Sequence, residues 1–265
     1  MPDVPYSCLR VERTGTVVEL TLCRPELHNR IDAVAHSELV AAFREIEQME
    51  DVRAVVFAAE GKTFSAGGDF EIILAGNEDA KLRNEMRDEG WRLLSSLVEI
   101  RQPMVAAVQG DAVGLGATLA LMCDVVVTHP QCRFSDPHVV VGLVAGDGGC
   151  LAWPMSVGMA RAKRHLLTGD AMTGDEAQAS GLVTDVVDSS ADVLPAARAL
   201  AERISKLPPL AVQGTKRALN SLVRLRFHEV MPISLGEELA TFGSEDLREA
   251  VHAFKERREG QYRGR

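Results

Sequence analysis

The sequence lacks the features that mark several large classes of protein. Its five cysteines form no CxxC pair, and it has no HExxH motif and no long uncharged apolar run. Its 29 Lys and Arg residues are outnumbered by 38 Asp and Glu residues, which gives a formal net charge of −9. These absences argue against a bound metal, a transmembrane protein and nucleic acid as the main partner.

The N-terminal segment Met1–Pro5 has neither a basic n-region nor an apolar h-region, so we expect no secretory signal and a cytoplasmic protein. In that compartment the cysteines are expected to be reduced thiols, and we interpret them as small buried apolar residues rather than catalytic or metal-binding groups. They are Cys8, Cys23, Cys123, Cys132 and Cys150.

The 265 residues are 46% hydrophobic, enough for a large core without disulfides. Strand-like and helix-like stretches alternate up to about residue 195, which predicts an α/β core over residues 1–195. Asp32 is predicted to cap a helix, and Thr173 and Glu176 form a capping box. Strand signals then disappear, so residues 196–265 are predicted to form an all-helical region that packs as a subdomain or on a neighbouring subunit.

Two short glycine motifs do not fit nucleotide-binding fingerprints. Gly61-Lys62-Thr63 resembles the end of a P-loop, but Val56 stands where that loop needs its first glycine. Gly114-x-Gly116 could begin a dinucleotide fingerprint, but Leu119 replaces the third glycine. We therefore reject both interpretations.

Two glycine-rich turns remain, each after a predicted strand. They are FSAGGD at 64–69 and GLG at 114–116, and the second opens a helix. Small residues let a ligand approach the backbone, and the first N–H groups of a helix point outward. Two such N–H groups directed at one carbonyl would form an oxyanion hole. The alternative is that both are simply tight turns with close helix–strand contacts.

Together with longer signatures, these turns resemble the crotonase superfamily of enoyl-CoA hydratases and isomerases. The resemblance covers nearly the whole chain. The first signature combines Arg24-Pro25-Glu26 and Asn29 with the stretch 61–69, and the second runs from Pro103 to Asp124. Later landmarks are Leu167-Thr168-Gly169 to Ala177, Gly181-Leu182-Val183 and Arg248-Glu249-Ala250 to Phe254.

The resemblance implies a crotonase-like spiral of ββα units with a helical C-terminal region, assembled as homotrimers or hexamers. It implies an acyl-CoA thioester as partner and no separate cofactor, since coenzyme A is part of the substrate. The backbone N–H groups of Ala66 and Leu115 match the family's oxyanion hole. The positions implied to bind CoA or the rest of the substrate are Lys62, Gly67, Gly68, Asp69, Gly114, Phe254 and Arg257. Arg257 also stands among other charges, where a solvated helix position is the alternative.

The sequence departs from the family pattern at two positions. Family hydratases use two glutamates, and Thr118 and His138 occupy those places here. A hydroxyl cannot replace a carboxylate base, and loss of one base usually costs about 10²–10⁴ in rate. Hydration by two glutamates is therefore not expected.

A His–Asp pair is the predicted replacement. His138 lies nine residues before Asp147, and a loop turning at Gly142 could bring the two together, so that Asp147 orients His138 as a base for water. The alternative is a packed histidine and a helix-capping aspartate. The pattern PHxxxGxxxGDG is similar to a β-diketone hydrolase branch of the superfamily, exemplified by 6-oxocamphor hydrolase. His36 also matches a pocket histidine of that branch, although an ordinary helix-face histidine fits its position too.

The sequence thus predicts an acyl-CoA-processing enzyme of the enoyl-CoA hydratase/isomerase type. Water activated by His138 would add to an enoyl double bond. The first alternative is a retro-Claisen hydrolase that cleaves a C–C bond in a β-keto-acyl-CoA or β-diketone. An isomerase would need a carboxylate base, for which Glu71 and Glu85 are weakly placed. The last alternative is a non-catalytic acyl-CoA-binding protein.

Overall fold

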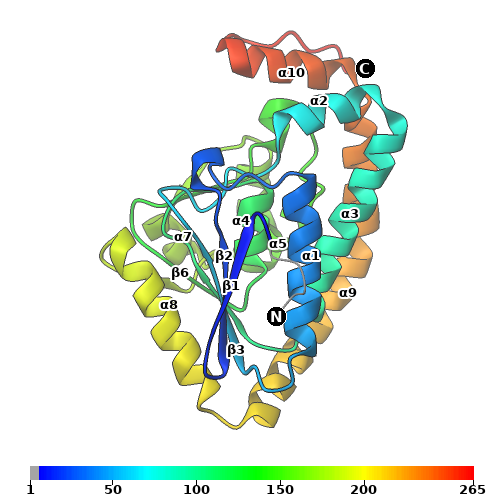
Figure 1. The fold of residues 1–265 in the computed structure, drawn as a ribbon. Coiled ribbons are helices and arrows are strands. Elements are labelled where there is room, and N and C mark those ends of the chain that lie inside the picture. The colour runs from blue at the N-terminus through cyan, green and yellow to red at the C-terminus, as the bar shows by residue number, and fades with distance from the viewer. Residues whose placement is uncertain (1–5) are drawn as a thin grey trace.

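The computed structural model describes residues 6–265 and contains two β-sheets with helices packed around them (Figure 1). Residues 1–5, where we expect no export signal, lie outside the described residues. The six-stranded sheet has the order β1-β2-β3-β4-β6-β9, and the three-stranded sheet has the order β5-β7-β8. The strands are β1 Leu9–Thr14, β2 Val17–Leu22, β3 Ala54–Ala59, β4 Met104–Ala107, β5 Ala112–Val113, β6 Val125–Thr128, β7 Arg133–Ser135, β8 Met172–Thr173 and β9 Asp185–Val186.

The strand pairing follows from the alternation in the sequence. β1 and β2 form the expected antiparallel hairpin around Gly15, whose φ is +61°. From β2 onward the large sheet is parallel, with β2 on β3, β3 on β4, β4 on β6 and β6 on β9. Parallel neighbours need long crossover connections, which the helices supply. The α/β class predicted from the sequence is therefore confirmed.

The helices begin and end where the capping signals stand. The Asp32 side chain accepts the Ala35 N–H at the start of α1, and Thr173 and Glu176 form the complete capping box of α7. Gly181 closes α7 in the left-handed conformation. The helices are α1 Ala33–Gln48, α2 Phe70–Glu78, α3 Ala80–Glu99, α4 Leu115–Leu121, α5 Gly149–Val157, α6 Met159–Leu166, α7 Gly174–Ser180, α8 Ser190–Ser205, α9 Pro209–Phe242 and α10 Glu245–Glu256, with short 3₁₀ helices η1 Pro25–Leu27 and η2 His138–Val141.

Each face of the large sheet has its own core. Along β3, Val55 and Phe57 point into the larger core, which also holds residues of α1, α3 and α9. Val56 and Ala58 point to the opposite face, where α8 covers the sheet. This alternation explains the unbroken apolar run of β3, since a parallel strand is buried on both sides.

The C-terminal helices do not separate at the predicted boundary. The predicted junction of residues 195 and 196 falls inside α8, which packs on the sheet with Pro195 accommodated in the helix. Two of the C-terminal helices lie beyond the sheet layer. Helix α9 runs beside α3, and helix α10 lies near α2 and η2 (Figure 1). Within the described residues, no helix combines the length and the apolar character needed to cross a bilayer.

A partly buried ion pair attaches α9 to the sheet. The Lys216 ammonium donates to an Asp124 carboxylate oxygen at 2.6 Å and to the Gln102 carbonyl at 2.8 Å. We expect Lys216→Met to lower the free energy of unfolding by about 2–3 kcal/mol, below the loss for a fully buried pair, because part of Asp124 stays in contact with water. Urea unfolding measures this loss. Lys206→Met breaks an exposed pair with Glu202 and should leave stability unchanged, so equal losses in both variants would contradict the prediction.

Candidate active site

The two glycine-rich turns lie against each other. Ser65 forms a parallel bridge with Ala112, and its carbonyl accepts the Val113 N–H at 3.0 Å. Gly67 has a φ of +79°, and a Cβ built there would lie 2.6 Å from the Val113 oxygen. A Cβ on Gly116 would lie 2.5 Å from the Cβ of Ser65. Glycine is therefore needed on both turns for the two backbones to approach.

Only one of the two predicted oxyanion donors is free. Leu115 is the first residue of α4, and its N–H has no hydrogen-bond acceptor anywhere in residues 6–265. The Ala66 N–H instead donates to the His28 carbonyl at 2.9 Å. The Asn29 side chain fixes the neighbouring His28 backbone in place, because it donates to the carbonyls of Glu60 and Thr63. The prediction of two free, converging amides is therefore wrong for Ala66.

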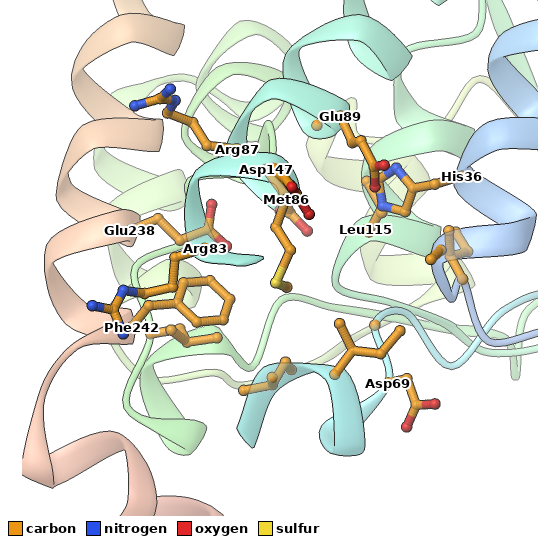
Figure 2. A pocket seen from close by; sticks show the side chains of 18 of the residues that line it. His36, Asp69, Arg83, Met86, Arg87, Glu89, Leu115, Asp147, Glu238 and Phe242 are labelled. Carbon is orange, nitrogen blue, oxygen red and sulfur yellow. The ribbon is translucent and has the colours of Figure 1, made fainter. Parts of the chain in front are cut away.

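A cavity of about 230 Å³ lies in front of Leu115 and is bounded by α1, α2, α3 and α9 (Figure 2). Most of its wall is apolar, with Ile72, Ile73, Met86, Leu235 and Phe242 among the lining side chains. Titratable residues interrupt this wall from several elements. Those discussed below are His36, Asp69, His138, Asp147 and Glu238.

His138 lies between two carboxylates. Its Nδ1 is 2.5 Å from an Asp136 oxygen, and its Nε2 is 3.3 Å from an Asp147 oxygen. The Asp136 side chain is fully buried, whereas the Asp147 side chain is 16% exposed and reaches the cavity. Asp136, which the sequence analysis did not single out, therefore orients the ring, and Asp147 lies on the ligand side.

The two carboxylates determine the charge of His138. Burial by itself would lower the pKa of the imidazole, but the charges of Asp147 and Asp136 outweigh burial and raise the pKa well above its ordinary value. The two carboxylates therefore favour the protonated ring, in which both nitrogens donate. A protonated ring has no lone pair to accept a proton from water. The arrangement therefore favours Asp147 over His138 as the group that accepts a proton, and the role of His138 as the base stays a prediction.

Glu238 brings a second carboxyl group to the cavity from α9. Burial, followed by the negative charge of Asp147, raises the pKa of Glu238 well above its ordinary value, although His138 opposes the shift. Burial and the Asp147 charge therefore favour the protonated form of Glu238, which is able to donate a proton. The cavity thus combines an acceptor, Asp147, with a donor, Glu238, and such divergent environments are typical of acid–base pairs.

His36 lines the same cavity from α1. Burial lowers its pKa to about 4, so the imidazole is neutral, and its buried Nδ1 has no hydrogen-bond partner among residues 6–265. Thr118, in contrast, does not line the cavity, and its buried hydroxyl also has no partner in the described part of the chain. The structure therefore places His36 at the cavity, whereas Thr118 lies outside the cavity wall.

The depressed pKa of His36 predicts a pH-dependent stability. Between pH 6.5 and 4 the unfolded state binds a proton that the folded state does not, so stability falls as the pH falls through this window. At pH 5 the loss relative to pH 7 is expected to be about 2 kcal/mol from this residue. Urea unfolding of His36→Gln at both pH values should show a correspondingly smaller loss. His252→Gln, on the exposed face of α10, is the control, and an identical pH response in wild type and His36→Gln would refute the assignment.

The residues predicted to bind coenzyme A are spread over a wider surface. Asp69 is buried, caps α2 through the Glu71 N–H, and pairs with Arg30 at 3.3 Å. Gly68 and Asp69 line the cavity, whereas the other predicted positions do not. Of these positions, Lys62 is exposed. Gly114 has a φ of +53°, and a Cβ built there would point at the His138 ring. Phe254 is 52% exposed and packs on Phe70, and Arg257 ends α10 in the left-handed conformation.

The Asp136–His138–Asp147 group also has the residue types of a metal site. One potential ligand atom from each residue lies within 4.8 Å of the others. The two carboxylates, however, lie at opposite nitrogens of one ring, and each already contacts a nitrogen. A cation would have to replace these contacts, so the arrangement fits proton transfer better than metal binding.

The fold and this cavity define an enzyme of the crotonase superfamily. The chain matches the profile of the family described as enoyl-CoA hydratase/isomerase over residues 12–265 and therefore belongs to that family. It is 31% identical to a probable enoyl-CoA hydratase of Mycobacterium tuberculosis over 257 residues, 97% of this chain and 98% of that protein. It is 32% identical to the 2,3-dehydroadipyl-CoA hydratase of Escherichia coli over 261 residues, 97% and 99% of the two chains. The crystal structure of an enoyl-CoA hydratase/isomerase from Mycobacterium paratuberculosis superposes with a TM-score of 0.89 at 35% identity, covering 95% of this chain and 99% of that one.

Proposed function

We propose that the protein adds water to the acyl group of an acyl-CoA thioester, using Asp147 as base and Glu238 as acid. The observation that supports this most directly is the pairing of the two carboxyl groups in one apolar cavity. Asp147 contacts the protonated His138, whereas the pKa of Glu238 is raised so that it keeps its proton. The family's usual pair of glutamates is thus replaced by a pair from other elements.

The proposed hydration involves three proton transfers. Asp147 takes a proton from water as the oxygen adds to Cβ of an enoyl thioester, and electrons move to the thioester oxygen. The free N–H of Leu115 stabilises this oxyanion. Glu238 then gives its proton to Cα, and transfer of a proton from Asp147 back to Glu238 restores the site. His138 remains protonated throughout and stabilises the Asp147 carboxylate.

The residue at position 118 is also compatible with a second reaction, retro-Claisen cleavage. Thr118 places no carboxylate on α4, and its hydroxyl lies outside the cavity wall. The same base and acid would also serve retro-Claisen cleavage, in which water attacks a β-keto carbon, the C–C bond breaks, and Glu238 protonates the enolate that leaves. This reaction needs no group at position 118.

Turnover of two substrate series distinguishes these reactions. Crotonyl-CoA and longer enoyl-CoA esters report hydration through loss of the conjugated absorbance, and β-keto-acyl-CoA esters report cleavage through the products. Activity on one series that is lost in Glu238→Gln, with acyl-CoA binding retained, would support the proposal. Binding without turnover of either series would favour a non-catalytic acyl-CoA-binding protein.

We also propose that coenzyme A binds only as part of the substrate, along the loop that includes Lys62 and Asp69, in a cytoplasmic homotrimer or hexamer. Exposed apolar side chains on α9 support assembly, among them Leu219, Leu222 and Ile233. Sedimentation velocity measures the assembly directly, and a monomer at micromolar concentration would contradict it.

A further inference from the structure

The loop over residues 142–148 determines where Asp147 stands relative to His138. His138 opens η2, and the loop then runs without helix or strand to α5. Its first part is tied to η2, because the Leu143 N–H donates to the His138 carbonyl at 2.9 Å. Its last part is tied to α5, because the Gly148 carbonyl accepts the N–H groups of Leu151 and Ala152. The segment between these anchors carries the proposed base.

Two hydroxyl groups of α9 hold that middle segment. The Ser234 hydroxyl donates to the Gly146 carbonyl at 3.1 Å, and the Thr241 hydroxyl oxygen accepts the Val144 N–H at 3.3 Å. The Thr241 hydroxyl also donates to the Glu238 carbonyl at 2.8 Å, which leaves its oxygen oriented as an acceptor. Within residues 6–265, these are the two hydrogen bonds that join Val144 and Gly146 to another element.

The loop lies directly on the backbone of α9. A Cβ on Gly146 would lie 2.5 Å from the Ser234 oxygen and 2.5 Å from the Glu238 Cβ, so the contact leaves no room for a side chain. Ser234 is buried, and positions 234, 238 and 241 share one face of the helix. The same face therefore presents the proposed acid and supports the loop that carries the proposed base.

Accordingly, we propose that Ser234 and Thr241 are positioning residues, which fix the 142–148 loop on α9 and so keep Asp147 in contact with His138 and beside Glu238. This inference rests on the proposed function, since it assigns Asp147 its role. A displacement of about 1 Å in a reacting group can cost about 10² in rate. Loss of either hydroxyl leaves the loop with one attachment to α9 in place of two.

The test uses Ser234→Ala and Thr241→Val in the full chain. We expect kcat to fall about tenfold in each with KM within twofold of wild type, and Thr241→Ser to restore wild-type kcat. Ser221→Ala, which removes an exposed hydroxyl from another face of α9, is the matched control. If Ser234→Ala does not fold, Thr241→Val tests the same loop from its other attachment.

A second measurement does not depend on turnover. His138 faces Asp136 and Asp147, with the titratable side chains of Glu238 on α9 and Cys150 on α5 nearby and His36 on α1 beyond Asp147. When Asp147 moves away, the imidazole loses one of its two carboxylates, so its NMR titration should shift to lower pH in both variants. Unchanged titration and unchanged kcat would overturn the positioning role. Full activity in Asp147→Asn would instead overturn the proposed function, and the two failures are thus distinct.

Discussion

Asp147→Asn is expected to lower kcat/KM by about 10²–10⁴, the effect of losing one catalytic base. The amide has the shape of the carboxylate but cannot accept a proton from water at neutral pH. The substitution also removes the negative charge that faces His138 Nε2 at 3.3 Å, so Asp136 is the carboxylate that still pairs with the imidazole. Steady-state kinetics on the enoyl-CoA or β-keto-acyl-CoA substrate identified for the wild type measures the loss.

The control for this variant is Asp170→Asn, on an exposed carboxylate that pairs with Arg164 and does not line the cavity. It carries the same chemical change and should retain wild-type kinetics. Binding of a saturated acyl-CoA should be similar in both variants, because Asp147 acts on the reacting water. Wild-type turnover by Asp147→Asn would exclude Asp147 as the base.

Leu115→Pro is expected to lower kcat by about 10²–10³, the usual effect of removing one oxyanion donor. The exchange deletes an N–H that has no acceptor within the described residues and that opens α4 at the cavity. Proline is tolerated at the first position of a helix, and Gly114 has no Cβ to clash with the ring. Single-turnover kinetics report the chemical step apart from product release.

Leu115→Ala separates the amide from the side chain. It keeps the N–H and removes most of the apolar contact that Leu115 makes with the cavity, so it should change KM more than kcat. A proline variant as active as the alanine variant would show that the Leu115 amide does not contact the developing charge.

Much of the fold was predictable because its signals are local. Asp32, the pair Thr173 and Glu176, and Gly181 each satisfy backbone groups within one turn of their own position, so the sequence marks these helix ends directly. Helix α2 was not anticipated, since its start depends on Asp69, which was interpreted as part of a ligand loop. The end of the core was misplaced for a similar reason. The strand signals end near residue 195, but α8 runs through that position and packs on the sheet.

The site was predictable only where the chemistry lies close together in the chain. His138 and Asp147 were identified, whereas Glu238 resembles any charge on a long helix until the 142–148 loop packs against it. Asp136 stands two residues before His138, and an Asp-x-His spacing was the signal available for it. The direction of the Ala66 amide depends on the segment at His28 and Asn29, where both residues have positive φ. No local pattern specifies that long-range contact.

The bond between Ala66 and His28 has a consequence for selectivity. A ligand oxygen can reach that amide only by displacing a peptide carbonyl, which is a stronger acceptor than the carbonyl of a neutral thioester. An enolate oxygen bears much more negative charge and therefore competes more effectively for the Ala66 N–H. In the proposed reaction, the Ala66 amide would therefore bind the enolate in preference to the unreacted thioester, and this contact would contribute to the rate and not to substrate binding.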